Sequence, residues 1–305
     1  MHVTICIVGF RNAHEIQGCL EALSKSDHRD FRVVICENGG PQAHKALTAL
    51  LPRSLQEGQS VTTMLAPGNL GYAGGVNRCI KYAPLADAWW VVNPDTKPEP
   101  SALSALVERL DRGDCEAAGG LLYHDNGKVQ AYGGRWRPWM ARCESIGHGR
   151  DYADPVEAGK VESHMNYLLG ASMLISRRYV ETVGLMREDY FLYAEEVEWC
   201  LRGKCRGMRL GFAPGSRVLH GQGGTTGSAK AMKQRPRMPI YLDERNKLNV
   251  VRDTSPTKLP VAAALSLVML FLRFARRGAW RQLGYGLSGW RAGLRNERGI
   301  PPWMT

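Results

Sequence analysis

The first 125 residues alternate between short β-branched runs and amphipathic stripes of helical period. Such alternation predicts a mostly parallel sheet with helices on both faces, because parallel strands are joined by crossover helices. Ligands of these sheets bind where the strands end, so the residues after each strand matter most. The expected strands are 3–8, 31–36, 61–65 and 88–92, and the expected helices begin near Asn12, at 42, at 75 and after Ser101.

Polar residues and glycines follow all four expected strands. Asn12 comes after the first strand and can cap a helix, with Glu15 as its capping-box partner. The third strand is followed by the glycine-rich run 68–77, which contains Asn69 and Gly71. This run is typical of a phosphate-binding loop, although it is neither G-x-G-x-x-G nor a Walker A sequence. Ordinary turn chemistry is the alternative interpretation of these strand ends.

Two strand-end carboxylates indicate a nucleotide site. Asp95, in Asn93-Pro94-Asp95, can hold a divalent cation against a diphosphate, since Mg²⁺ is often bound by one or two carboxylates together with substrate phosphates. Glu37 can accept the N3–H of a pyrimidine base or bind a ribose hydroxyl. The alternatives are a simple Pro-Asp turn at Asp95 and a solvated loop acid at Glu37.

The second half of the chain carries candidate groups for catalysis. Glu195, Glu196 and Glu198 follow an aromatic stretch at the start of an expected helix, where the helix dipole stabilises a carboxylate that can act as a general base. His220 ends an expected strand, and the Gly/Thr-rich segment 221–227 after it predicts a lid over phosphates. A solvated acidic face and a purely structural histidine are the alternatives.

The remaining pattern of this half is less regular. Residues 124–165 combine tryptophans, glycines and histidines, and we expect an insertion that shapes a second pocket. The other expected elements are strands at 167–176, 209–213 and 217–220 and a helix at 194–204.

Taken together, these pieces resemble the family 2 inverting glycosyltransferases with the GT-A fold, and within them the bacterial rhamnosyltransferase-like branch. The resemblance covers about residues 3–250. It implies a Rossmann-like α/β fold. It depends on an ordered series of short motifs: Phe10-Arg11-Asn12, Glu37-Asn38, Asn69-Leu70-Gly71-Tyr72, Asn93-Pro94-Asp95, Gly170-Ala171-Ser172-Met173, the stretch from Phe191 to Glu198, His220 and Arg245-Asn246.

The resemblance implies a nucleotide-sugar site at the strand ends. Phe10 and Asn93 belong to it, Glu37 matches the acid that recognises the pyrimidine base, and Asn69 and Gly71 match the loop beside the nucleotide. The base-recognising acid is usually Asp in the family, so Glu37 is a departure that keeps the chemistry.

The resemblance also implies which residues hold the metal and carry the reaction. Asp95 matches the last acid of the D-x-D motif and His220 a histidine that helps to hold Mg²⁺ or Mn²⁺, while Arg245 matches a residue near the diphosphate. Glu196 matches the catalytic base. That base is usually Asp, so its neighbour Glu195 stays open as the alternative.

The implied reaction is a single in-line displacement with inversion. A sugar moves from a pyrimidine nucleotide, dTDP-rhamnose or a UDP-hexose, to a hydroxyl of a glycan acceptor, expected to be lipid-linked, in cell-surface polysaccharide synthesis. We expect a catalytic domain over 1–230, with a nucleotide-sugar half at about 1–125 and an acceptor half at about 126–230, and a basic helical region over 231–305. A catalytically silent assembly partner with the same fold is the alternative, but the acids at the nucleotide and base positions favour an enzyme.

The C-terminal region predicts a membrane-surface segment. Residues 231–305 hold 14 Lys and Arg against four acids, almost all of the chain's net charge of +11. The uncharged run 259–272 would make a helix about 21 Å long, short of the ~30 Å hydrocarbon core. Arg273, Arg276, Arg277 and Arg281 are expected on one helical face, which fits a helix in an anionic bilayer surface. A buried core helix is the alternative for 259–272.

The composition also bounds location and partners. Eight cysteines without C-x-x-C spacing indicate a reduced compartment, and no basic segment with a long apolar stretch follows Met1, so we expect no signal peptide. We therefore expect a cytoplasmic protein, peripheral on the inner face of the cell membrane. Nucleic acid is not an expected partner, because the apolar run does not fit it. A homo-oligomer is left open.

Overall fold

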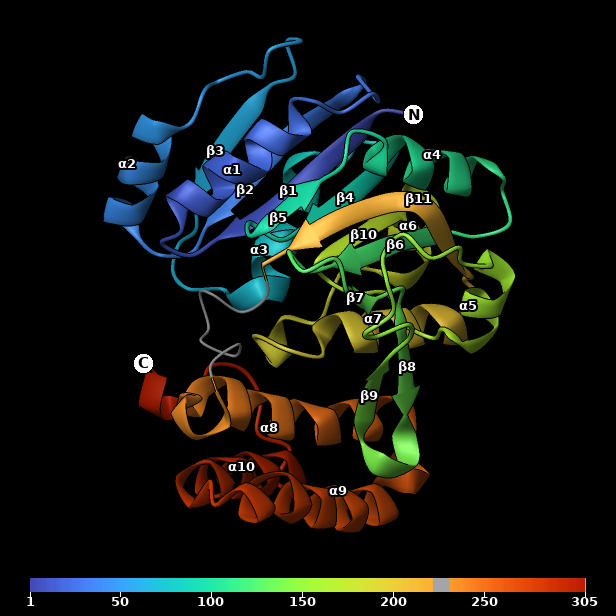
Figure 1. Cartoon of the computed structure of the whole chain (residues 1–305). Coiled ribbons are helices and arrows are strands. Elements are labelled where there is room, and N and C mark those ends of the chain that lie inside the picture. The colour runs from blue at the N-terminus through green and yellow to red at the C-terminus, as the bar shows by residue number, and fades with distance from the viewer. Residues whose placement is uncertain (222–230, 305) are drawn as a thin grey trace.

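The computed structural model describes residues 1–221 and 231–304 (Figure 1). These residues form a nine-stranded sheet of order β3-β2-β1-β4-β10-β6-β11-β5, with β7 paired to β6. Of the lid predicted over 221–227, all but Gly221 lies outside the described residues. The strands are β1 (Val3–Gly9), β2 (Phe31–Glu37), β3 (Val61–Leu65), β4 (Ala88–Val92), β5 (Thr96–Pro98), β6 (Ala117–Tyr123), β7 (Val129–Ala131), β10 (Ser172–Ser176) and β11 (Leu210–His220).

The sheet is mostly parallel, as the strand–helix alternation predicts. Strands β3, β2, β1 and β4 run parallel to one another, and β11 runs parallel to β6. Strand β10 is antiparallel to both β4 and β6, so β4 and β6 point the same way. The carboxyl ends of these parallel strands therefore lie along one edge of the sheet.

Both faces of the sheet are covered by helices. In β1, Ile5 and Ile7 pack on one face with Leu20 of α1, whereas Cys6 and Val8 pack on the other face with α3. This period of two follows from the alternation of side chains along a strand. The first face is covered by α1 (Ala13–Leu23), α2 (Pro41–Leu50) and α4 (Ala102–Asp111), and the second by α3 (Gly71–Tyr82), α6 (Arg177–Val183) and α7 (Glu195–Cys205).

The glycine-rich run is the main point where the structure corrects the sequence prediction. Helix α3 begins at Gly71, four residues before the predicted start at 75, so most of the expected loop is helical. A Cβ on Gly75 would lie 2.6 Å from Cγ1 of Val8, so this glycine lets α3 approach β1. Gly71 has φ +69, a left-handed conformation that favours glycine.

Three smaller predictions are also corrected. The strand predicted over 167–176 is only Ser172–Ser176, and the strands predicted over 209–213 and 217–220 are one strand, β11, with an irregular register between Phe212 and Arg217. The Asn12 side chain does not cap α1. Its Oδ1 instead accepts a hydrogen bond of 3.0 Å from the Phe10 backbone N–H.

The irregular region contains an antiparallel hairpin of β8 (Gly134–Arg137) and β9 (Arg142–Ser145). Its tip is the 3₁₀ turn η1 (Pro138–Met140), and α5 (Ala158–His164) follows it in the chain. Figure 1 shows the hairpin extending from the sheet toward the C-terminal helices, where η1 contacts α9 (Leu259–Phe274).

The C-terminal helices α8 (Arg237–Thr254), α9 (Leu259–Phe274) and α10 (Trp280–Leu294) form a layer beyond α7, with α9 and α10 farthest from the sheet (Figure 1). Helix α10 packs tightly on α8, since a Cβ on Gly289 would lie 2.2 Å from the carbonyl oxygen of Tyr241. The chain then returns past α8, and the Gly299 N–H donates to the Asp189 carbonyl at 2.6 Å. Short 3₁₀ turns complete the described elements: η2 (Glu188–Tyr190), η3 (Met232–Gln234), η4 (Pro256–Lys258), η5 (Ala275–Arg277) and η6 (Pro302–Met304).

One expectation for this region is modified and another is wrong. The uncharged run 259–272 is part of the helical run Pro256–Arg277, which has 22 residues and a mean hydropathy of 1.7, so by length and composition alone this longer run could cross a membrane. The four arginines do not share one helical face, because the chain turns at Gly278, where φ is +61. Arg281 therefore lies on α10, and Arg273 forms ion pairs with Asp243 and Glu244 of α8.

Asn246 of α8 holds the segment that leads into α7. Its side chain is fully buried, and its amide nitrogen donates to the carbonyls of Tyr190, Leu192 and Tyr193 at 2.8–2.9 Å. In this segment Phe191, Tyr193 and Ala194 have φ of +67, +71 and +69, which is unfavourable for residues with a side chain. The amide therefore stabilises a backbone conformation that the local sequence does not favour.

Replacing Asn246 with Ala should remove a donor from all three carbonyls, of which that of Tyr190 still accepts from the Leu192 N–H and from Arg245. We expect Asn246→Ala to lower the free energy of unfolding by about 3 kcal/mol, measured by urea denaturation. Asn126→Ala, at an exposed turn residue, is the control and should cost about 0.5 kcal/mol or less. Equal losses in the two variants would contradict the role given to Asn246.

Candidate active site

A cavity of about 420 Å³ lies at the carboxyl ends of the parallel strands. The segments after β1, β2 and β4 reach it, as do α3, the start of α7 and the end of β11. The sequence-predicted residues that line it are Phe10, Asn69, Gly71, Asn93, Asp95, Glu196 and His220. The fold thus brings together seven residues that are as much as 210 positions apart in the chain.

The β5–β11 ladder brings His220 to Asp95. His220 pairs with Thr96 in the antiparallel register, and the Gly221 N–H donates to the Asp95 carbonyl at 2.9 Å. Nε2 of His220 then lies 3.3 Å from Oδ1 of Asp95 and 3.3 Å from Nδ2 of Asn93. Both side chains are largely buried, with 7% and 18% of their surfaces exposed.

Gln130 of β7 determines which nitrogen of His220 carries the proton. Its Oε1 lies 2.7 Å from Nδ1 of His220, and an amide oxygen only accepts, so Nδ1–H must donate. In the neutral ring Nε2 is then an acceptor, and the Asn93 amide nitrogen and an oxygen of the Asp95 carboxylate both lie 3.3 Å from it. Nε2 and the carboxylate oxygen are both atoms that could bind a divalent cation.

The amino end of α3 forms a second wall of the cavity. Asn69 Oδ1 accepts from the Gly71 N–H at 3.1 Å, and the Asn38 side chain donates to the Gly71 carbonyl at 2.8 Å. The Tyr72 N–H donates to the Phe191 carbonyl at 2.8 Å, and a Cβ on Gly71 would lie only 2.0 Å from that oxygen. Gly71 is therefore required for the close approach of α3 to the segment before α7.

Glu195 and Glu196 open α7 and both line the cavity. The pKa of Glu196 is raised to about 7. Burial is the main cause and the charge of Asp243 on α8 adds to it, while backbone N–H groups at the start of α7 act in the opposite direction. The pKa of Glu195 is raised well above its usual range. Burial is the main cause and the charge of Glu196 is the second. Burial thus favours the protonated form of both carboxyls, and the adjacent charge favours it further at Glu195.

Two sequence-predicted residues do not line the cavity. Arg245 is 1% exposed, and its guanidinium donates to the carbonyls of Gly299 and Tyr190, so it holds the C-terminal segment against the chain before α7 instead of approaching a diphosphate. Glu37 is also 1% exposed, and its Oε1 accepts from the N–H groups of Arg11 and Gly39 at 3.0 and 2.6 Å. Its neighbour Asn38 is the residue of that strand end that reaches the cavity.

Several lining residues were not predicted from the sequence. Gln130 lies in the irregular region, where no motif marks it, and Met238 and Met304 come from the C-terminal layer. Tyr72, within the predicted motif, donates its hydroxyl to the Gly170 carbonyl at 2.6 Å and so joins α3 to the chain before β10. Only Tyr72 could have been found from the sequence, by its place directly after Gly71.

Among the described residues, no cluster of three or more His, Cys, Asp or Glu side chains could hold a metal ion by itself. Asp95 and His220 offer two ligands, and Mg²⁺ or Mn²⁺ commonly takes the rest from substrate phosphates and water. The site thus fits a cation that binds together with a diphosphate.

The comparisons with known proteins agree with this geometry. A family model described as Glycosyl transferase family 2 matches residues 4–183. An N-acetylglucosaminyl-diphospho-decaprenol L-rhamnosyltransferase of Mycobacterium tuberculosis is 25% identical over 251 residues, which are 73% of this chain and 77% of the relative.

Solved structures share the fold at low sequence identity. The mannosyltransferase PcManGT from Pyrobaculum calidifontis, solved with GDP-Man and Mn²⁺, aligns with a TM-score of 0.59 at 13% identity over 97% of this chain and 88% of its own. GalNAc-T7, solved with UDP, GalNAc and Mn²⁺, gives a TM-score of 0.60 at 15% identity over 85% of this chain and 53% of its own. The sheet and helices described above are therefore a GT-A fold. Since the family model matches more than half of the chain, the protein belongs to glycosyl transferase family 2 and is a glycosyltransferase.

Proposed function

We propose that this glycosyltransferase moves a sugar, rhamnose in the first instance, from a dTDP- or UDP-sugar to a hydroxyl of a lipid-linked glycan, with inversion at the anomeric carbon. The observation that carries the proposal is Glu196, a cavity carboxyl with a pKa of about 7, in the same cavity as Asp95 and His220. The similarity to a rhamnosyltransferase named for a diphospho-decaprenol acceptor supports the donor sugar and the acceptor class. Cell-surface polysaccharide synthesis is the corresponding process.

The donor diphosphate is proposed to bind between Asp95, His220 and the amino end of α3. A divalent cation, Mg²⁺ or Mn²⁺, would supply positive charge to the leaving diphosphate when bound by Asp95 and His220. The bound Mn²⁺ in the two structural neighbours supports this choice of ion. Phe10, Asn69 and Asn93 line the cavity around the nucleotide-sugar, and Glu37 fixes the backbone of the two neighbouring strand ends from behind.

Glu196 is proposed to act as the general base. Its carboxylate takes the proton of the acceptor hydroxyl while that oxygen forms a bond to the anomeric carbon of the donor. The bond from the anomeric carbon to the diphosphate oxygen breaks, and the nucleoside diphosphate leaves with its electron pair. Attack from the face opposite the leaving group inverts the configuration in one step.

Glu195 is proposed to bind a sugar hydroxyl as a neutral acid. Its Oε2 is buried and makes no hydrogen bond to any residue that the structure describes, although the side chain lines the cavity. A buried polar atom without a partner is costly unless a ligand supplies one. We thus assign the two roles by pKa. Glu196, with the lower pKa, is the base, and Glu195, with the higher pKa, is the sugar-binding group.

We further propose that the protein works at the inner face of the cell membrane, where a lipid-linked acceptor is presented. The nucleotide-sugar half is about 1–125, the acceptor half about 126–230, and 231–305 forms the region nearest to the membrane. Met238 and Met304 of that region line the cavity, which supports a contribution of the C-terminal layer to acceptor binding.

The proposed metal site predicts different effects for two substitutions, one at the metal ligand Asp95 and one at Gln130, which orients the ligand His220. Asp95→Ala should abolish Mn²⁺-dependent donor binding, whereas Gln130→Leu should weaken Mn²⁺ affinity about 10- to 100-fold, because the His220 ring loses the partner that fixes its tautomer. Calorimetric titration of Mn²⁺ in the presence of the nucleoside diphosphate measures both. Gln56→Leu, at an exposed residue, is the matched control. An affinity unchanged in Gln130→Leu would refute the orienting role.

The assignment of the base predicts a difference between two adjacent isosteric changes. Glu196→Gln should lower kcat by roughly 10²-fold or more and leave donor affinity nearly unchanged. Glu195→Gln should have a milder effect, since an amide resembles the neutral acid in shape and can still hydrogen-bond a hydroxyl. Steady-state kinetics with a soluble acceptor fragment and donor titrations test both. If Glu195→Gln is the more damaged variant, the two roles are reversed.

The raised pKa of Glu196 predicts the pH dependence of the reaction. Because the base must be ionised, kcat should rise with pH through about 7 and level off above it. Asp243→Asn removes a nearby negative charge, lowers the pKa of Glu196 and should move this acid limb to lower pH. A kcat profile between about pH 5 and 9 measures the shift. An acid limb at the same pH in the two proteins would remove Asp243 from this role.

A further inference from the structure

The outer face of α9 is apolar along its whole length. Its large exposed residues are Val261, Leu265, Val268, Phe271 and Leu272, each between 41% and 54% exposed. The face of α9 toward the protein carries smaller residues in its first half, since Ala262, Ala263 and Ser266 are buried there. The larger apolar residues of α9 therefore form a contiguous surface that is exposed to water. Exposed apolar surfaces of this kind commonly mark a site of interaction with another molecule or with a membrane.

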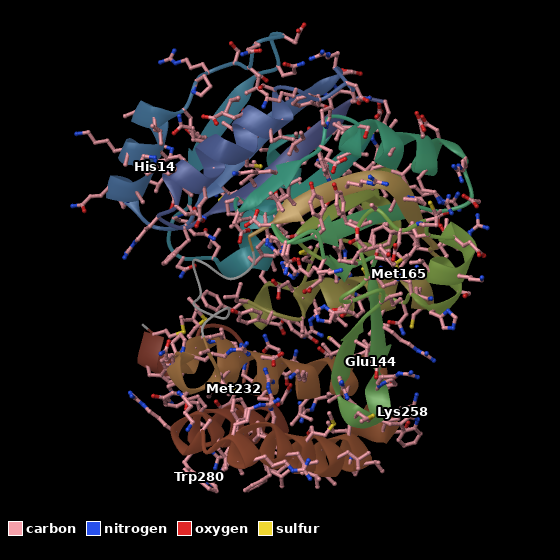
Figure 2. The ribbon with its side chains drawn as sticks, viewed as in Figure 1. His14, Glu144, Met165, Met232, Lys258 and Trp280 are labelled. Carbon is pink, nitrogen blue, oxygen red and sulfur yellow. The ribbon has the colours of Figure 1, made fainter. Side chains whose placement is uncertain are left out.

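The two ends of this face carry tryptophans and basic residues. At one end Trp139 of η1 is 51% exposed and the Lys258 ammonium lies 5.4 Å from its ring centre. At the other end Trp280 is 67% exposed, beside the exposed Arg276, Arg277 and Arg281. Figure 2 shows Lys258 and Trp280 at opposite ends of the layer formed by α8, α9 and α10.

The chain stretch that forms most of this face carries charge of one sign. The sequence has no Asp or Glu between Asp253 and Glu297, while the same stretch holds seven Lys and Arg. Tryptophan and arginine at the border of an apolar strip are typical of a helix that lies at the level of lipid headgroups. A soluble partner protein would have to match both the apolar strip and the basic ends.

The connections of α9 argue against a single crossing of the membrane. Helix α8 precedes α9 and α10 follows it, so one crossing would put these two helices on opposite sides. Yet α10 packs on α8 so closely that a Cβ on Gly293 would lie 2.7 Å from the Arg245 carbonyl oxygen. Trp290 of α10 also donates its ring N–H to the Ala263 carbonyl of α9 at 3.1 Å.

From these observations we propose that the face formed by Trp139, the outer residues of α9 and Trp280 is a docking surface for an anionic lipid bilayer, with α9 lying in the plane of the membrane. We name it the α9 face. The inference deepens the proposed function, because it gives the surface by which the enzyme would reach a lipid-linked acceptor. Its apolar strip enters the headgroup region, and Lys258, Arg276, Arg277 and Arg281 contact anionic headgroups.

The test is co-sedimentation of the full chain with vesicles of phosphatidylcholine alone or mixed with phosphatidylglycerol. The wild-type protein should bind the mixed vesicles more tightly, and high salt should reduce that preference. Val268→Lys should weaken binding to the mixed vesicles about tenfold or more, since it removes an apolar side chain from the centre of the strip. Leu85→Lys makes the same kind of change at a residue that is 79% exposed but outside the α9 face, and should bind like wild type.

The basic ends are tested separately. Arg276→Ser with Arg277→Ser should lower affinity for the mixed vesicles by roughly 5-fold per residue and leave binding to neutral vesicles little changed. Thermal melting and nucleotide binding should match wild type in every variant, because none of these residues lines the cavity. These readouts need no sugar transfer, so failure of the proposed reaction would leave vesicle binding intact and would be recognised as a separate result.

Three outcomes would overturn the proposal. Equal vesicle binding by Val268→Lys and wild type would show that the α9 face does not enter the bilayer. A wild-type dimer that Val268→Lys converts to a monomer, without vesicle binding by either, would assign the face to a second copy of the chain. Membrane-bound protein that resists alkaline carbonate and is released only by detergent would mean that α9 crosses the membrane.

Discussion

The catalytic end of this protein depends on a side-chain amide that lies outside the cavity. Asn246 of α8 donates to the carbonyls of Tyr190, Leu192 and Tyr193, and so holds three non-glycine residues in a left-handed conformation directly before α7. Because α7 begins at the next residue, this conformation sets where Glu195 and Glu196 enter the cavity. The same segment presents the Phe191 carbonyl to α3, which explains why only glycine is possible at position 71.

The pairing of β5 with β11 plays the corresponding role at the other side of the cavity. It places His220, the last residue of β11, next to the Asp95 carboxylate, which follows β4. Gln130 of β7 fixes the orientation of the His220 ring. Nε2 of His220 and Oδ1 of Asp95 lie 3.3 Å apart at the edge of the cavity, so the two side chains present a nitrogen and an oxygen ligand next to each other. In the proposed reaction a donor diphosphate would bring the remaining oxygen ligands of the cation, so two ligands from the described residues would suffice.

The sequence was sufficient for those parts of the fold that depend on local pattern. The strands 61–65 and 88–92 were predicted with their bounds, because buried β-branched and aromatic runs end there at clear turn signals. Several residues of the cavity, among them Phe10, Asn93 and Asp95, were predicted because the carboxyl ends of parallel strands converge at one edge of the sheet. Arg245 and Gln130 show the limit. Whether an arginine reaches a ligand or a buried carbonyl depends on a chain segment more than 50 residues away, and Gln130 has no pattern around it.

The sequence predicted that the C-terminal region is basic and helical, but it did not predict how its helices are arranged. The basic residues were expected along one helix, whereas the turn at Gly278 divides them between α9 and α10 and moves Arg273 into ion pairs with α8. The consequence is a rigid connection between the α9 face and the reaction centre. Helix α8 carries Asn246, which fixes the start of α7, and its residue Asp243 contributes to the pKa of Glu196, while its outer side packs against α10. In the proposed membrane-bound enzyme, α8 would therefore hold Glu196 at a fixed height above the bilayer, because this one helix contacts both the start of α7 and the layer that carries the α9 face.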